Sequence, residues 1–236
     1  MKVYFWGTKG SLPSSSLAEE IHKKIFFAIK ESMAYDLKTD SDIEAFIKKH
    51  LPFYIRGSYG TNTSCIEIIG GNEYVLCDAG TGIRDFGNNL IKNKAAKKDR
   101  QSNIFHIFLS HLHWDHIHGF PFFTPAYMPG NRINIYGFHE NIREALEAQQ
   151  SQPFFPVPLR YMSADIRFET LEPDREYHIA GLGIRGFKQD HPGVSYGYRF
   201  EKEGKAIVYS SDCEHREGPE RDDYVFLNFF RDADLL

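Results

Sequence analysis

Four side chains that bind metal ions well lie within six residues of one another: His111, His113, Asp115 and His116. They follow an apolar, strand-like run at residues 104–109. Neutral imidazole and carboxylate are good zinc ligands, and a loop at the end of a strand can direct alternating side chains into one cavity. The alternative is a set of surface histidines with one buried member, which this spacing disfavours. The pattern therefore predicts a metal site.

The predicted metal site belongs to a chain that alternates strand-like and helix-like segments. Residues 63–70 and 73–80 have the period of two that is typical of strands, and Gly70, Gly71 and Asn72 favour a tight hairpin turn between them. Helices are predicted at residues 83–98 and 140–150, and further strands at 104–109, 133–136, 166–171, 177–179, 183–188, 195–200 and 206–209. This alternation indicates an α/β sandwich of sheets covered by helices.

Residues 17–51 have a different pattern, in which apolar side chains recur every three or four residues. Ile21, Ile25 and Ile29 follow this spacing, and a second group surrounds Phe46, with Lys and Glu between the apolar positions. The pattern predicts two amphipathic helices.

The composition favours a single globular domain over residues 1–236. Hydrophobic residues make up 42% and charged residues 25% of the chain, which excludes a disordered or fibrous protein. The formal net charge of −4 argues against a broad basic surface, so we expect a small substrate and no long nucleic acid as a partner.

The cysteines and the N-terminus indicate a cytoplasmic protein. Cys65, Cys77 and Cys213 are odd in number and lack CxxC spacing, so we expect buried free thiols in a reducing compartment. The N-terminus enters a strand directly, without the features of a secretory signal. No apolar run approaches the roughly 20 residues that span a bilayer, so no membrane partner is expected.

The motif HLHWDH resembles the HxHxDH signature of the metallo-β-lactamase superfamily, a specific motif where it follows a buried strand. Other segments are similar, in the same order, to phosphodiesterase-like members, which include ribonuclease Z and a group of bacterial cyclic phosphodiesterases. These segments are FWGTKGS, GTNTSCIEI, LCDAGTGIR, HPGVSYGYRF and IVYSSDCEH. The resemblance covers most of the chain except residues 17–56. It implies an αββα sandwich with the site at one edge, between two sheets.

The resemblance also implies how the ligands divide between two divalent metal ions. His111, His113 and His191 match the ligands of the first metal, Asp115 and His116 match those of the second, and Asp212 matches a carboxylate that bridges both. We expect zinc, although manganese and iron also suit His and Asp ligands. Two adjacent cations can ionise a shared water and polarise a phosphoryl group. Asp115 is the candidate catalytic residue, because a carboxylate beside such a nucleophile can orient it and handle its proton.

The sequence departs from the family pattern at the last ligand of the second metal. Relatives carry a histidine after a strand that resembles DADLLIFDA, whereas this chain stops at DADLL and has no histidine after His215. We expect a truncated C-terminus; the alternative is a second site with fewer protein ligands. His118 is expected to orient a ligand. His215 could replace the missing ligand or lie at the surface, but the role that we assign to it is contact with a substrate phosphate.

Residues 17–56 are the second departure, a helical insertion where relatives continue almost directly. Its apolar faces need a partner. A buttress, a lid over the site and a dimer interface are all compatible with the pattern. The buttress is the default, and a homodimer through the inserted helices is the functional option to test first.

Three functions follow from these residues. The first is a metal-dependent phosphodiesterase that cleaves a small phosphodiester, such as a cyclic nucleotide, by attack of a metal-bound hydroxide. The second is a hydrolase of a carboxylic ester, thioester or lactam, because the same nucleophile attacks carbonyl groups. The third is a non-catalytic sensor that binds metal and nucleotide without cleavage.

Overall fold

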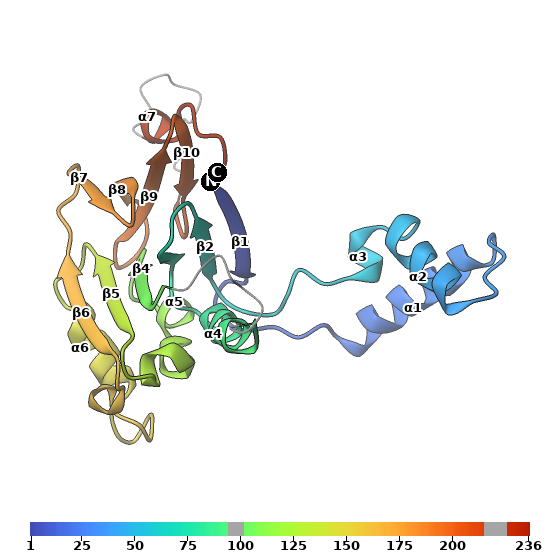
Figure 1. Cartoon of the computed structure of the whole chain (residues 1–236), viewed down its shortest axis with the longest axis horizontal. Coiled ribbons are helices and arrows are strands. Elements are labelled where there is room, and N and C mark those ends of the chain that lie inside the picture. The colour runs from blue at the N-terminus through green and yellow to red at the C-terminus, as the bar shows by residue number, and fades with distance from the viewer. Residues whose placement is uncertain (94–101, 215–225) are drawn as a thin grey trace. The chain divides into compact units, whose positions relative to one another are not determined.

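The computed structural model describes residues 1–93, 102–214 and 226–236 in two compact units (Figure 1). The sandwich unit comprises Met1–Leu12 and Asn62–Leu236, and the helical unit comprises Pro13–Thr61. The organisation of the chain as one domain stays a prediction.

Two sheets form the sandwich unit (Figure 1). One has six strands in the order β1-β2-β3-β4-β5-β6, and the other has four in the order β10-β9-β8-β7. The strands are β1 (Lys2–Gly7), β2 (Cys65–Ile69), β3 (Tyr74–Cys77), β4 (Ile104–Phe108), β5 (Arg132–Gly137), β6 (Asp165–Thr170), β7 (Glu176–Ile179), β8 (Leu182–Gln189), β9 (Ser195–Lys202) and β10 (Lys205–Tyr209). From β3 to β6 the neighbours run parallel, while β1, β2 and the whole four-stranded sheet pair antiparallel.

Helices cover the face of the six-stranded sheet that points away from the second sheet. They are α4 (Gly82–Asn93), α5 (Trp114–Ile117) and α6 (Ile142–Gln149), with short 3-10 turns η1 (Phe120–Phe122), η2 (Thr124–Tyr127) and η3 (Leu159–Tyr161); α7 (Leu227–Phe230) follows β10. Buried side chains of α4 and α6, such as Phe86 and Leu146, join Ile107 and Ile133 of the sheet in one core.

The strand β4 is buried on both faces, as a central parallel strand should be. Phe105 and Ile107 belong to the core beneath the helices, whereas Phe108 belongs to a second core between the sheets, with Tyr198 and Phe200 of β9. Successive strand residues point to opposite faces, which is why one short apolar run can serve both cores. The α/β sandwich predicted from the sequence is confirmed.

Some boundaries differ from the prediction. The helix predicted at residues 83–98 is α4, which ends at Asn93, and residues 94–98 lie outside the described part of the chain. At the end of the chain, Leu235 forms a single parallel β-bridge with Ile207 of β10, and its carbonyl oxygen accepts a bond from Val208 N–H at 2.9 Å.

The helical unit contains α1 (Ala18–Ser32), α2 (Asp40–Lys49) and α3 (Phe53–Arg56). Thr39 caps α2 in a capping box, because its side chain accepts from Asp42 N–H while the Asp42 carboxylate accepts from Thr39 N–H. Lys24 Nζ donates to the Gly57 carbonyl oxygen at 2.5 Å. The two predicted helices are present, and their status as an insertion relative to the family stays a prediction.

Two further sequence-based expectations concern the thiols and the membrane. Cys65 and Cys77 are free and buried as expected, whereas Cys213 is free but half-buried. Within the described ranges, no helix is both long and apolar enough to cross a membrane.

Candidate metal centre

Strand ends place the candidate ligands. Because β3 and β4 are parallel neighbours, both end at the same edge of the sheet, where Asp78 N–H donates to the Phe108 carbonyl oxygen at 2.9 Å. His111 follows β4, and the single turn of α5 then carries Asp115 and His116. Two connections of the second sheet complete the cluster: His191 lies between β8 and β9, and Asp212 follows β10.

The first ligand group consists of His111, His113, His191 and Asp212. His113 Nδ1 lies 3.0 Å from His111 Nε2 and 3.2 Å from His191 Nε2. Asp212 Oδ2 lies 3.8 Å from His111 Nε2 and 3.6 Å from His191 Nε2. Ligand atoms around a tetrahedral zinc ion with Zn–N bonds of 2.0–2.1 Å are about 3.4 Å apart. The four atoms therefore have the spacing of ligands to a single ion.

The second ligand group consists of Asp115, His116 and Asp212, so Asp212 belongs to both. His116 Nε2 lies 3.3 Å from Asp115 Oδ2 and 3.6 Å from Asp212 Oδ1. This nitrogen is buried and has no hydrogen-bond partner among the described residues. A buried nitrogen without a partner costs free energy, which a metal ion bound between these carboxylates would recover. The donor set therefore fits a divalent cation.

Asp78 determines which nitrogen of His116 is free. It is fully buried, and its Oδ2 lies 2.6 Å from His116 Nδ1. The same carboxylate accepts from Ser110 N–H at 2.7 Å, from Ser110 Oγ at 2.9 Å and from the Tyr209 hydroxyl at 2.5 Å. A histidine that gives Nδ1–H to a carboxylate presents the Nε2 lone pair to a metal. Asp78 thus braces the site and belongs to neither ligand group.

The candidate ligands differ in whether they are already deprotonated at pH 7, as metal binding requires. Burial, with repulsion from His116, lowers the pKa of His111 to about 4, so its ring is neutral at pH 7. Contact with His116 lowers the pKa of Asp212 to about 2, and His111 and His191 add to this effect. Burial also opposes a charge on His116, but Asp78, Asp212 and Asp115 together outweigh it and raise its pKa to about 10. A metal ion must therefore displace a proton from His116.

Loops in unusual conformations hold two of the ligand segments. In the loop of His191, Val194 has a φ of +64°, and its carbonyl oxygen lies 2.9 Å from His139 Nε2. A positive φ is rare for a β-branched residue, and such strain is typical of functional sites. Ser11 also has a positive φ, +60°, and its backbone N–H donates to Asp115 Oδ2 at 2.8 Å. The first loop of the sandwich unit therefore holds Asp115.

Two glycines allow two backbone segments of the site to pass close to each other. A Cβ on Gly119 would lie 2.1 Å from the Gly80 carbonyl oxygen, and one on Gly80 would lie 2.4 Å from the Asp115 carbonyl oxygen. These contacts leave no room for a side chain. The segment after β3 and the turn after α5 can therefore pass close enough to keep Asp78 beside His116.

The structure brings together six residues proposed from the sequence, namely His111, His113, Asp115, His116, His191 and Asp212. Two other histidines differ from expectation or escape description. His118 Nδ1 lies 2.7 Å from the Trp114 carbonyl oxygen within its own turn, so the expectation that it orients a ligand is wrong. His215, assigned to substrate contact, lies outside the described residues.

Sequence reasoning missed Ser11 and Tyr209 as neighbours of the ligands. Ser11 acts through its backbone N–H, which no residue type reveals, although the quoted motif FWGTKGS ends on it. The Tyr209 hydroxyl lies 2.6 Å from Ser64 Oγ and donates to Asp78, so it reaches the cluster through a chain of hydrogen bonds. It lies in the segment IVYSSDCEH, which also contains Asp212.

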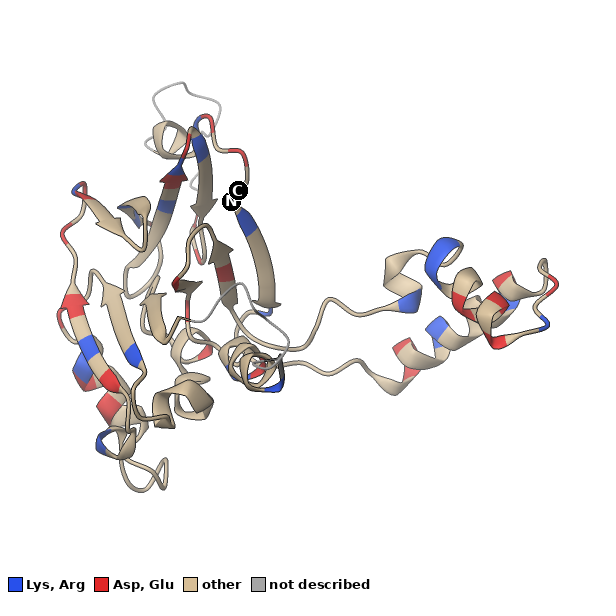
Figure 2. Ribbon diagram, viewed as in Figure 1, with Lys and Arg blue, Asp and Glu red and all other residues tan. Residues whose placement is uncertain are grey.

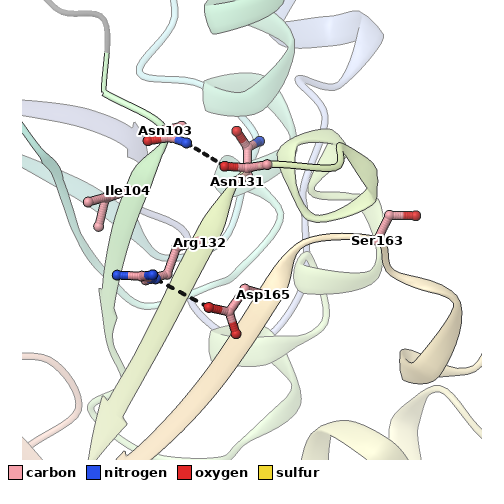
Figure 3. Close-up of a pocket in the computed structure, with 7 residues that line it drawn as sticks. Asn103, Ile104, Asn131, Arg132, Ser163 and Asp165 are labelled. Atoms are coloured by element: carbon pink, nitrogen blue, oxygen red, sulfur yellow. Dashed lines mark hydrogen bonds and ion pairs between the residues drawn. The ribbon is translucent and has the colours of Figure 1, made fainter.

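A pocket of about 300 Å³ lies at the other end of the parallel strands (Figure 3). It is lined by Asn103, Ile104, Gly130, Asn131, Arg132, Ser163 and Asp165. Arg132 Nε pairs with Asp165 Oδ2 at 3.2 Å, and Asn103 donates to the Gly130 carbonyl oxygen. These residues start β4, β5 and β6, whereas the metal cluster follows the strand ends, so the pocket is separate from it.

Fold and ligand cluster together define an α/β protein with a candidate metal site at the edge of a two-sheet sandwich. The family model of the beta-lactamase superfamily domain matches residues 73–236. The chain belongs to the metallo-β-lactamase superfamily, and the resemblance seen in the sequence is confirmed. This fold implies divalent metal ions, typically zinc.

Relatives and solved structures agree with this family. Ribonuclease Z of Haloarcula marismortui is 25% identical over 150 residues, which cover 61% of this chain and 43% of that protein. The short form of human tRNase Z aligns with 100% of this chain and 76% of its own, at 19% identity and a TM-score of 0.51. The metallo-beta-lactamase fold protein YhfI of Bacillus subtilis aligns with 75% of this chain and 64% of its own, at 19% identity and a TM-score of 0.52. The matched region thus spans less than half of the ribonuclease Z relative.

Proposed function

We propose that this protein is a metal-dependent phosphodiesterase that cleaves a small phosphodiester, such as a cyclic nucleotide. The observation that carries the proposal is the sharing of Asp212 between two ligand groups, with the partnerless His116 Nε2 pointing into one of them. Two adjacent divalent ions, when bound there, would polarise a phosphoryl group and make nearby water more acidic. The relatives named ribonuclease Z support phosphodiester chemistry, since a ribonuclease cleaves phosphodiesters.

The roles of the protein's own groups follow from their contacts. His111, His113 and His191 would hold one ion, Asp115 and His116 the other, and Asp212 both. Asp115 would also orient the attacking water and accept its proton, because Ser11 N–H fixes the carboxylate beside the cluster. His113, His191 and Asp212 are the ligands that are not buried, so a substrate would enter from their side.

A small substrate agrees with the charges of the described residues. Lys and Arg are interspersed with Asp and Glu over the sandwich unit, as Figure 2 shows, and the net charge of the whole chain is −4. Long nucleic acids are held mainly through basic contacts to many phosphates. The proposal therefore places recognition at the metal centre itself, on one phosphodiester group.

The test is turnover of bis-p-nitrophenyl phosphate and of 3′,5′-cyclic AMP with zinc or manganese. We expect turnover by the protein and a loss of at least about 100-fold in kcat/KM in His113→Ala, because one ligand of a shared site is removed. His178→Ala is the matched control, since that side chain is 80% exposed and outside both ligand groups. It should leave turnover unchanged.

Three results would contradict the proposal. Hydrolysis of an ester, thioester or lactam panel without phosphodiester turnover would make the protein a carbonyl hydrolase. Bound metal and bound nucleotide without any cleavage would make it a sensor. Equal turnover by His113→Ala and the parent protein would separate the activity from this cluster.

A further inference from the structure

Tyr209 is the last residue of β10, three positions before Asp212. Its side chain packs against the core between the two sheets, and its hydroxyl reaches the end of β3 in the first sheet. There it donates to Asp78 Oδ2 at 2.5 Å. Tyr209 therefore joins the strand that leads to Asp212 with the carboxylate that orients His116.

The Tyr209 hydroxyl has a second partner in the first sheet. Its oxygen lies 2.6 Å from Ser64 Oγ, in the residue before β2. A carboxylate only accepts hydrogen bonds, and a tyrosine hydroxyl has a single proton to give. Because that proton goes to Asp78, Ser64 is the donor in the contact with Tyr209. The hydroxyl is thus held on both sides by side chains of the first sheet.

The Asp78 carboxylate connects Tyr209 with two candidate ligands. Its Oδ2 bonds His116 Nδ1 directly at 2.6 Å. It also accepts from Ser110 Oγ at 2.9 Å, and Ser110 Oγ lies 3.0 Å from His111 Nδ1. Both rings are held at Nδ1, so Nε2 is the nitrogen that is left for a metal ion. A displaced Asp78 would disturb His116 more than His111, because the latter is held through Ser110.

Asp212 lies between two anchors of its own segment. Before it, the Tyr209 hydroxyl ties β10 to the first sheet. After it, Glu214 N–H donates to the Asp190 carbonyl oxygen at 2.6 Å, one residue before His191. The anchor at Glu214 keeps Asp212 near a ligand of the first group, whereas the anchor at Tyr209 keeps it near the second group.

The second ligand group depends on the anchor at Tyr209. His116 Nε2 lies 3.6 Å from Asp212 Oδ1, although the two residues follow strands of different sheets. Two ligands of one ion must keep such a separation, because bonds to zinc are about 2.0–2.2 Å long. Two hydrogen bonds and three positions of chain connect His116 with Asp212, by way of Asp78 and Tyr209. This short path fixes the distance between the two ligands.

We propose that Tyr209 is a positioning residue for the second metal ion. Its hydroxyl holds Asp78 against His116, and it holds the end of β10 so that Asp212 lies beside that ring. The inference rests on the metal centre of the proposed function, but it does not depend on the substrate that this centre cleaves.

Calorimetric titration of the metal-free protein with zinc tests this role. Asp115→Ala and His113→Ala assign the two binding steps, because each substitution removes a ligand of one group only. We expect Tyr209→Phe to weaken zinc binding at the second group by about tenfold or more, as the loss of a group that orients ligands does, and to change binding at the first group by less than about twofold.

Tyr136→Phe is the matched control, because it also removes a hydroxyl from the core between the sheets. The side chain of Tyr136 is 5% exposed, and its hydroxyl lies 3.1 Å from Nδ1 of His106, which belongs to neither ligand group. Both zinc affinities should stay unchanged in this variant, and the melting temperatures of the metal-free proteins report any general loss of stability.

Ser64→Ala is a second, milder test of the same path. It removes the donor to the Tyr209 hydroxyl and leaves the bond to Asp78 in place. We expect weaker zinc binding at the second group, by a smaller factor than in Tyr209→Phe. The double variant should bind zinc as Tyr209→Phe does, because effects that act through one chain of hydrogen bonds are not additive.

The other outcomes would overturn the proposal. Equal weakening of both steps in Tyr209→Phe, with a lower melting temperature of the metal-free protein, would make Tyr209 a structural residue only. Unchanged zinc affinities would show that its hydrogen bonds have no role, and a single zinc ion in the parent protein would leave no second ion to position. Selective loss of the second ion in a protein that does not cleave bis-p-nitrophenyl phosphate would instead support this inference and contradict the proposed function.

Discussion

At the scale of single residues, the surroundings of His116 favour metal binding at its Nε2 atom. Asp78 takes its Nδ1, burial removes water, and no described residue bonds its Nε2. In the absence of a metal ion His116 is protonated at pH 7 among the carboxylates of Asp78, Asp115 and Asp212, so a bound metal ion has to displace that proton.

This arrangement predicts how the stability of the metal-free protein depends on pH. The pKa of His116 is raised to about 10 in the folded chain, against about 6.5 when unfolded. A raised pKa stabilises the fold fully below pH 6.5, and this contribution is lost as the pH rises toward 10. In EDTA-treated protein, the free energy of unfolding of the parent minus that of His116→Gln should therefore fall from pH 6.5 to pH 9.5. Urea denaturation at each pH measures this difference in the free energy of unfolding. A difference that does not change with pH would refute the raised pKa of His116.

Trp114 is the exposed aromatic residue between two proposed ligands, His113 and Asp115. Its indole is 75% exposed, and no ring contact is found for it among the described residues. Trp6, the only other tryptophan, donates to Glu67 Oε2 at 3.1 Å and packs against Phe86. An exposed aromatic ring beside the proposed phosphodiesterase site suits stacking on a base.

The expected consequence is that Trp114→Ala raises KM for a nucleotide phosphodiester by about tenfold or more, with kcat nearly unchanged, because stacking contributes about 1–3 kcal/mol per base. Dimethyl phosphate binding, as an inhibitor, should not change, since it has no ring. In Trp6→Phe, where Trp114 is the remaining fluorophore, AMP should quench the emission. Absence of quenching, with an unaltered KM, would remove Trp114 from the substrate site.

At the scale of elements, the helices and strands are predicted best where the local pattern of apolar residues matches their environment in the fold. The parallel strands and their helices were predictable because buried strands are continuous apolar runs and surface helices are amphipathic. His111, His113, Asp115 and His116 were predictable because they lie in one loop. His191 and Asp212 came only from the resemblance, since nothing local indicates that connections of the second sheet reach the first.

The sequence does not reveal which backbone groups contact the candidate ligands. Ser11 at the end of the first loop is an instance, because its N–H acts on Asp115 and its side chain does not. Its positive φ would suit glycine, yet serine stands there. Contacts of this kind depend on the path of the chain, which composition and spacing do not determine.

Ser11 supplies a prediction for this loop. Ser11→Gly keeps the donor and relieves the backbone, so turnover should stay within about twofold of the parent. Ser11→Pro removes the N–H and cannot adopt this φ, so kcat should fall by about 10- to 100-fold, as for other groups that orient ligands. Elemental analysis of the metal content and measurement of the melting temperature distinguish a misplaced Asp115 carboxylate from an unfolded protein. Equal kcat values for the two variants would show that the contact has no role.

At the scale of the whole molecule, the metal centre joins the two sheets. His111 and His116 follow a strand of the first sheet, whereas His191 and Asp212 follow strands of the second. A ligand that binds only the folded state stabilises it by about 2.7 kcal/mol at 100 times its dissociation constant. Because the candidate ligands come from three separate segments, metal binding should hold the edges of the sandwich together in addition to serving the proposed reaction.

Metal removal should therefore lower the melting temperature by about 5–10 °C, as expected for a domain of this size. Asp212→Ala should bind less metal than His113→Ala, because Asp212 belongs to both ligand groups and His113 to one. The shift caused by EDTA in scanning calorimetry should accordingly be largest in the parent, smaller in His113→Ala and smallest in Asp212→Ala, in step with the zinc content by mass spectrometry. If Asp212→Ala kept the metal content and the EDTA shift of the parent, the two groups would not share that carboxylate, and the cluster would have to act as separate sites.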